Sequence, residues 1–145
     1  MSADLIAGLA RKIDADVKAL EVSFAPALTG AIPPGFFTQK ASQVLPIIAN
    51  CVAAKNLIPP APGGLIKRSQ FDGIEKKLKE FNTDNFPFLE SQVNIYVTAP
   101  EPSTRATALA QIVQKVPGII ADYVVMKNEL RKVKKALRVW EIVKS

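Results

Sequence analysis

Few side chains in this sequence have the types and spacing that enzyme chemistry requires. The 145 residues include no histidine, the usual proton carrier near neutral pH and a common metal ligand. Asp14 and Asp16 lie two positions apart, so on a helix they do not share a face as a catalytic carboxylate pair would. Cys51 falls on an apolar helix face, which is typical of a buried thiol rather than a nucleophile. We therefore predict a non-enzymatic protein with no cofactor, no metal site and no small-molecule substrate.

Positive charge gathers near the carboxyl end of the sequence. The net charge is +6, and the segment from Lys127 to Arg138 holds six cations and one acid, Glu129. A helix there would carry cations along one side, and they could contact an anion such as nucleic acid or remain solvated. The candidates for anion contact are Arg131, Lys132, Lys135 and Arg138. A basic nucleic-acid-associated accessory protein is therefore the alternative function, although few aromatic residues remain to stack on bases.

The strongest indication of a packing partner is a heptad stripe of apolar residues in the last third of the chain. Apolar side chains recur there in alternating steps of three and four, the pattern of a helix that packs along another helix. The heptad stripe consists of Leu109, Ile112, Val116, Ile119, Tyr123, Met126, Leu130, Val133, Leu137 and Trp140. We predict that it is an interface to another chain, with packing inside its own chain as the alternative. The run from Ile119 to Met126 is apolar almost all round, which favours a partner on more than one side.

Pro117 and Gly118 test how long this helix can be. If the helix only bends there, residues 103–143 span about 60 Å at 1.5 Å per residue. A compact chain of this length has a radius of gyration of about 15 Å, so such a helix would project beyond its own globule. If Pro117 instead begins a new helix, the remainder fits within the globule.

The elements that must position these residues are all predicted to be helices. Apolar periodicity and capping residues predict helices at 3–22, 38–56 and 69–81, and a further one at 84–97, where alternation also allows a strand. Two proline-rich connectors separate them, at 24–37 and in a strap at 57–68. The predicted fold is one all-α domain, 1–145, with helical parts 1–56 and 69–145 on either side of the strap. It has four or five helices and a long C-terminal helix kinked near Pro117.

The middle of the chain also needs to be covered. From Val22 to Ile66 the only formal charges are Lys40 and Lys55. If this segment were exposed, its apolar surface would associate with other molecules. Seven prolines interrupt this segment, which argues against a membrane span and favours contact with protein. The aromatic side chains of the first connector are predicted to insert into hydrophobic hollows at an interface, and they are Phe24, Phe36 and Phe37.

These patterns favour a structural role. We predict a subunit of a larger assembly, bound to copies of itself or to other proteins, with a virus or phage particle as the first candidate. The amino-terminal sequence lacks a basic segment followed by an apolar one, so we expect no secretory signal. The single cysteine agrees with a reducing compartment. The expected location is the cytoplasm or a particle assembled there.

Overall fold

The computed structural model describes residues 3–30, 32–58 and 66–144, and the side chains of Ala3 and of residues 140–144 are outside the description. Every regular element in these ranges is a helix, so the all-α prediction is confirmed. The helices are α1 (Ala3–Ser23), α2 (Ala25–Leu28), α3 (Phe36–Leu57), α4 (Arg68–Glu80), the π-helical turn η1 (Phe81–Asn85), α5 (Phe86–Thr98) and α6 (Pro102–Lys144).

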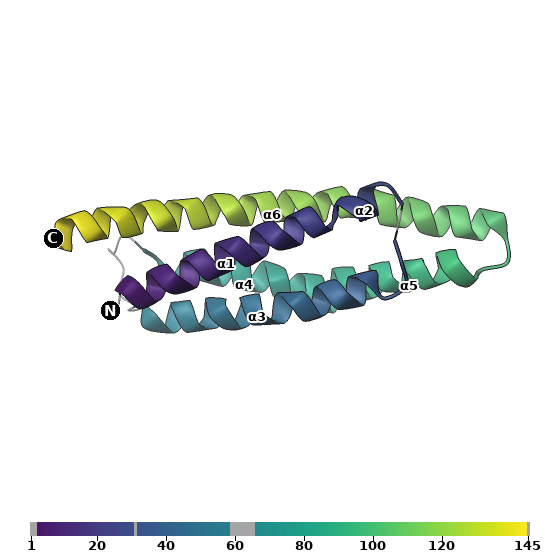
Figure 1. The fold of residues 1–145 in the computed structure, drawn as a ribbon. Coiled ribbons are helices and arrows are strands. Elements are labelled where there is room, and N and C mark those ends of the chain that lie inside the picture. The colour runs from purple at the N-terminus through teal and green to yellow at the C-terminus, as the bar shows by residue number, and fades with distance from the viewer. Residues whose placement is uncertain (1–2, 31, 59–65, 145) are drawn as a thin grey trace.

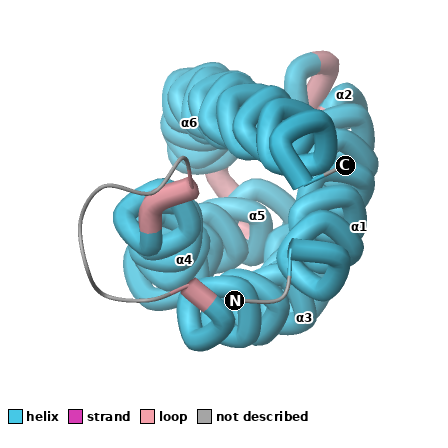
Figure 2. Tube along the Cα trace, turned by 90° about the vertical axis from the view of Figure 1, so that its left-hand side faces the viewer, coloured by secondary structure: helices cyan, strands magenta, loops and turns pink. Residues whose placement is uncertain are grey.

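These elements form four rods that run alternately up and down (Figure 1). The rods are α1 with the short α2, then α3, then α4–η1–α5, and finally α6. Viewed from the end, α6 and α3 occupy opposite corners of the bundle, with α1 and α4 at the other two (Figure 2). Each rod therefore packs against two neighbours and keeps one side for the solvent, as in other antiparallel four-helix bundles.

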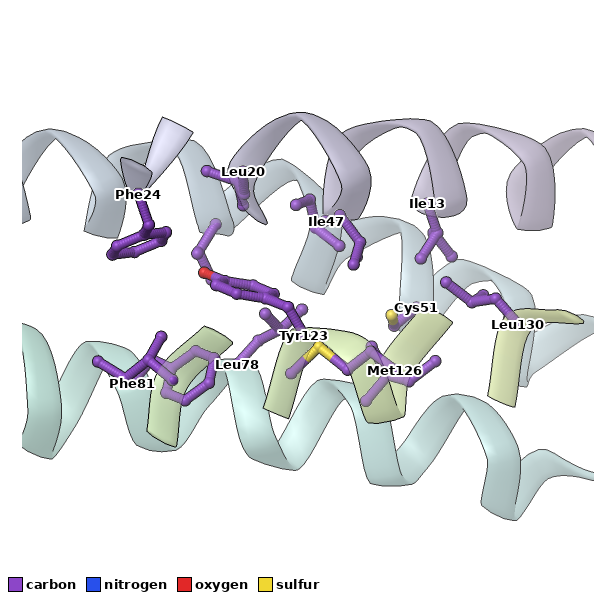
Figure 3. Packing of buried hydrophobic residues seen from close by; sticks show 14 of the residues in the cluster. Ile13, Leu20, Phe24, Ile47, Cys51, Leu78, Phe81, Tyr123, Met126 and Leu130 are labelled. Atoms are coloured by element: carbon purple, nitrogen blue, oxygen red, sulfur yellow. The ribbon is translucent and has the colours of Figure 1, made fainter. Parts of the chain in front are cut away.

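One continuous apolar core joins the four rods. Its centre is aromatic: Tyr123 of α6 lies against Phe24 and Phe81, with ring centroids 5.5 and 5.4 Å apart (Figure 3). Phe24 also contacts Phe36 and Phe86 at centroid distances of 6.0 Å in each case. Such pairs contribute about 0.5–1.5 kcal/mol beyond the area they bury, so this cluster fixes how the rods meet.

The first connector is shorter and more ordered than the sequence predicted. Residues 24–37 were expected to be extended, but Pro26 stands in the first turn of α2, where its missing N–H costs nothing. Helix α3 begins at Phe36, two residues earlier than expected. The residue before it, Gly35, has φ +85°, a left-handed conformation that favours glycine.

The amino terminus of α3 is capped by a side chain from another rod. The Glu90 carboxylate of α5 accepts hydrogen bonds from the backbone N–H groups of Gly35, Phe37 and Thr38 at 3.0, 3.0 and 3.1 Å. A helix begins with N–H groups that have no partner within the helix, and a negative charge there is favoured by the helix dipole. Glu90 therefore does the work of an N-cap and ties α5 to α3.

Replacing Glu90 by alanine is expected to lower the free energy of unfolding by about 1–2 kcal/mol, because three N–H groups lose their acceptor. Glu90→Gln keeps one acceptor oxygen and should cost less. The measurement is the urea unfolding midpoint of the two variants and the wild type. Equal midpoints for all three proteins would show that water replaces the cap without loss.

The third rod passes through a π turn where the sequence predicted a helix end. The helix predicted at 69–81 would end at Asn82, a residue that tolerates a left-handed cap. No described residue other than glycine has the positive φ of such a cap. The helix instead widens over Phe81–Asn85, where the Phe86 N–H donates to the Phe81 carbonyl, and then continues as α5. Residues 84–97, which the sequence left between helix and strand, are therefore helical.

Helix α6 continues through Pro117 from Pro102 to Lys144, so the proline does not start a new helix. Figure 1 shows it gently bowed along the whole bundle. A helix of this length was predicted to project beyond a compact globule, but the molecule is not a compact globule. The other rods are also long, so the bundle is elongated and α6 stays beside its own chain. Residues 59–65 of the predicted strap lie outside the described residues.

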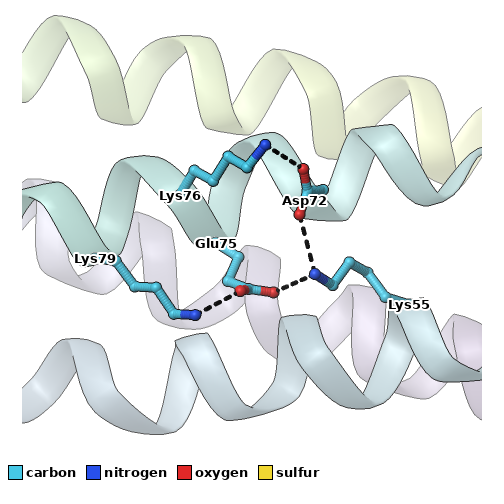
Figure 4. Close-up of polar contacts among 5 residues, drawn as sticks. All are labelled: Lys55, Asp72, Glu75, Lys76 and Lys79. Atoms are coloured by element: carbon cyan, nitrogen blue, oxygen red, sulfur yellow. Dashed lines mark hydrogen bonds and ion pairs between the residues drawn. The ribbon is translucent and has the colours of Figure 1, made fainter.

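Ion pairs around one buried carboxylate, that of Glu75, connect α3 to α4. Lys55 of α3 reaches Glu75 and Asp72 of α4 at N–O distances of 2.7 and 3.0 Å, and Lys79 reaches Glu75 at 2.7 Å (Figure 4). Glu75 is only 6% exposed. Burial acts to raise its pKa, but the hydrogen bonds from Lys55 and Lys79 outweigh this and hold the pKa below its ordinary value. Glu75 is therefore ionised at neutral pH, and Lys55 and Lys79 stabilise its charge.

Candidate interaction surface

The heptad stripe lies in the core of its own chain. Its side chains from Ile112 to Leu137 are buried against the other rods, and Leu109 is half-buried. The Trp140 side chain falls outside the described residues, although its backbone belongs to α6. The intramolecular alternative thus accounts for the described part of the stripe. An interface to another chain must use other residues while the bundle stays folded.

The three phenylalanines predicted at an interface also lie inside the bundle. Phe24 and Phe37 are fully buried, and Phe36 is 7% exposed. As predicted, they insert into hydrophobic hollows, but these hollows lie within the same chain and not at an interface. The prediction that they contact a partner is corrected by this burial.

The side of α6 opposite the heptad stripe is exposed and carries no charge over about six turns, from Ala106 to Asn128. Its most apolar members are Val113, Val124 and Val125, which are 42%, 40% and 59% exposed. We define the uncharged face of α6 as the exposed residues Ala106, Ala110, Val113, Gln114, Pro117, Gly118, Ala121, Val124, Val125 and Asn128. Water contact with this many apolar side chains in one continuous strip marks a candidate interaction surface.

Charged residues of the same part of α6 turn toward neighbouring rods instead. Lys127 pairs with Glu21 of α1. Asp122 lies 3.9 Å from the Lys77 ammonium of α4, and the Lys115 ammonium lies 4.4 Å from the centre of the Phe88 ring of α5. This part of α6 therefore does contain charged residues, but they lie on other sides of the helix than the exposed strip.

A second uncharged face lies on α3, at the opposite corner of the bundle (Figure 2). Leu45 and Val52 are 58% and 36% exposed there. We define the uncharged face of α3 as the exposed residues Ser42, Gln43, Leu45, Pro46, Ala49, Val52, Ala53 and Asn56. The sequence predicted that apolar residues would be covered almost all round this helix, and in the single chain Leu45 and Val52 are not.

The rods between these two faces expose charge. The outer side of α1 carries Arg11, Lys12 and Lys18, and that of α4 carries Lys76 and Lys79. Where α1 and α4 flank the two faces, uncharged corners therefore alternate with charged ones, whereas α5, the other half of the third rod, exposes Ile95 and Val97. Burying an uncharged face against protein carries no charge-desolvation penalty, whereas burying the faces of α1 or α4 would.

A shallow hollow of about 210 Å³ borders the uncharged face of α6. It lies between α4 and α6 with Ile74 and Met126 among its lining residues. Gly73 leaves it open, because no atom lies within 4 Å of the position that a side chain would take. The hollow gives this edge of the face a depression into which a side chain of a neighbour fits.

By length and composition, one described helix passes a test for a membrane span, the part of α6 from Pro102 to Val139. The test is weak, because a core helix of a soluble bundle passes it as well. Only 28% of its most apolar stretch is buried, which agrees with the exposed strip described above. Its other side forms the bundle core, so α6 is explained as a bundle helix with one uncovered face.

The predicted anion contacts are exposed on the carboxyl-terminal third of α6. Arg131, Lys135 and Arg138 point away from the core, and Lys132 also pairs with Glu129 at 3.1 Å. The uncharged face therefore ends where the cations begin, after Asn128. The two surfaces follow one another along the same helix.

Among the buried side chains, Cys51, Lys40 and Tyr123 carry groups that titrate. Burial raises the pKa of the Cys51 thiol to about 12, with the Glu75 charge acting in the same direction. Burial lowers the pKa of Lys40, whose ammonium lies 4.8 Å from the centre of the Phe36 ring. The Tyr123 hydroxyl is buried without a hydrogen-bond partner among the described residues, and burial raises its pKa. Cys51 and Tyr123 are therefore protonated at neutral pH, and Lys40 packs against the Phe36 ring.

Comparisons of the chain with protein-family models, curated proteins and solved structures find no match.

The sequence contained a signal for the uncharged face of α6 that we interpreted only in part. Ile119–Met126 was recognised as apolar all round, and the structure divides it between the core and the exterior. Ile119, Tyr123 and Met126 are buried, whereas Val124 and Val125 are exposed. The excess of apolar residues beyond the heptad stripe was thus the informative part of the pattern.

Proposed function

We propose that this protein is a non-enzymatic structural subunit that assembles with copies of itself through the uncharged faces of α6 and α3. The observation that carries the proposal is the placement of the two faces at opposite corners of one rigid bundle. A molecule that is adhesive on two opposite sides joins a neighbour on each side, and such contacts produce rings or extended arrays. The charged faces of α1 and α4 keep the other two sides hydrated.

Other features support an assembly role. The apolar members of both faces except Leu45 are small or β-branched, so an approaching helix can come close over most of each face. The single core holds the rods together without a partner, so each copy can fold before it assembles. A place in a virus or phage particle, assembled in the cytoplasm, is the specific form of this proposal. The small size of the chain supports it.

The test is the molar mass of the purified protein as its concentration rises, measured by light scattering. We expect species well above the monomer mass of 15.7 kDa. Ala121→Glu and Ala49→Glu each place a charge in the middle of one uncharged face and should reduce the mass. Ala15→Glu makes the same change at an exposed position of the charged helix α1 and should not.

A wild-type protein that stays monomeric at high micromolar concentration would overturn the proposal. The same holds if Ala15→Glu reduces the mass as much as the two face variants do. Circular dichroism of all three variants checks that the bundle remains folded, because exposed alanine positions tolerate glutamate in a helix.

A further inference from the structure

A hollow with a cationic rim lies between α1 and α6, beyond the uncharged faces. It has a volume of about 180 Å³. Ala7 and Leu137 contribute apolar lining, and three cations complete it, Arg11 from α1 with Lys134 and Arg138 from α6. Arg11 and Lys134 are 123 positions apart in the sequence, so only the fold brings these charges together.

The nearest acid does not neutralise this hollow. The Asp14 carboxylate, one turn from Arg11, already receives the ammonium groups of Lys18 and Lys134, each at 2.9 Å. Burial acts to raise the pKa of Asp14, but these two hydrogen bonds outweigh it and hold the pKa below its ordinary value. Among the residues whose side chains the structure describes, this one carboxylate thus faces two lysines, and no acid pairs with Arg11 or Arg138.

The positive charge continues along α6 from the hollow. Arg131 and Lys135 are exposed beside Arg138, and the rise from Arg131 to Arg138 is about 10 Å at 1.5 Å per residue. A row of cations of this length fits a ligand whose negative charges also recur along a line. Arginine binds phosphate oxygens through two parallel N–H groups, which lysine cannot do.

We propose that the hollow between α1 and α6 and the cation row beside it bind the phosphate backbone of a nucleic acid. Binding would be independent of base sequence, because the aromatic residues of the described core are buried and cannot stack on bases. A membrane surface fits less well. A helix that lies on a membrane has a stripe of apolar side chains alongside its cations. Among the described residues, the cationic part of α6 exposes one large apolar side chain, Val139, and the uncharged face lies further along the helix.

The experiment measures binding of a fluorescein-labelled single-stranded oligothymidylate by anisotropy over a series of salt concentrations. The test variant is Arg11→Gln with Arg138→Gln. The control, Lys76→Gln with Lys115→Gln, lowers the net charge equally at exposed positions away from the hollow. We expect the test variant to bind at least about tenfold more weakly at low salt. Its plot of log affinity against log salt should be shallower by about 1.4, since each lost phosphate contact removes about 0.7.

Equal weakening by the test and control variants would overturn the proposal, because net charge alone would then explain binding. The proposal is also wrong if the oligonucleotide does not bind while phosphatidylserine vesicles or polyglutamate do. Both variants replace exposed side chains, and thermal unfolding followed by circular dichroism checks that they remain folded.

Discussion

Replacing Leu130 by aspartate is expected to unfold the bundle. Leu130 is fully buried in the heptad stripe, between α6 and the neighbouring rods (Figure 3). Loss of its packing costs about 2–5 kcal/mol. A carboxylate in this position adds about 4 kcal/mol if burial shifts its pKa by three units. The sum, about 6 kcal/mol or more, is comparable with the whole stability of a typical domain.

The control for this prediction is Val124→Asp, on the same helix but on its exposed side. Val124 is 40% exposed, and valine and aspartate have similar helix propensities, so the change should cost less than about 1 kcal/mol. Far-UV circular dichroism and urea unfolding of dilute protein distinguish the two variants. A folded, monomeric Leu130→Asp protein would mean that the heptad stripe is not the core.

Removing the Lys55 ammonium is expected to have the second largest effect. In Lys55→Met the buried Glu75 carboxylate keeps only Lys79, and we expect a loss of about 3 kcal/mol at neutral pH. Lys76→Met is the matched control. Lys76 is exposed and pairs only with Asp72, at 2.9 Å, so its loss should cost less than about 0.5 kcal/mol (Figure 4).

The difference between Lys55→Met and the wild type should also depend on pH. In the wild type the pKa of Glu75 is below its ordinary value of 4.5. Its ionisation therefore stabilises the fold above about pH 4.5, and this contribution is lost as the pH falls through the folded-state pKa. In Lys55→Met the pKa of Glu75 is no longer lowered by Lys55, so the two proteins should converge in stability at acidic pH. Urea unfolding from pH 7 to pH 2.5 tests this, and a constant difference would contradict it.

Local patterns predicted the helices well, because an amphipathic helix reveals its buried side in its own spacing. The heptad stripe identified both the last helix and its inward side. The stripe could not tell whether the facing helix belongs to the same chain, because the spacing is the same in both cases. The prediction of a second chain depended on the diameter of a compact globule. Because the bundle is elongated, a 43-residue helix fits alongside the rest of a 145-residue chain.

Features that depend on contacts between distant residues were not predictable from the sequence. Glu90 caps a helix that begins more than fifty positions earlier, and nothing near either site marks the pair. For the hollow between α1 and α6, the sequence predicted Arg138 as an anion contact but did not predict Arg11. Asn82 was misinterpreted because a residue that tolerates a helix cap also fits in the interior of a wider turn.

The π turn changes the spacing of the buried residues in the sequence of the third rod. Its buried apolar residues follow steps of three or four up to Phe81, then a step of five to Phe86, then three and four again. In an ordinary α-helix a step of five would turn Phe86 about 140° away, yet here the two rings lie 5.6 Å apart. The wide turn absorbs one surplus residue and resets the phase of everything after it. Deleting a single residue there would rotate α5 by about 100° and point Leu89, Val93 and Glu90 away from their partners.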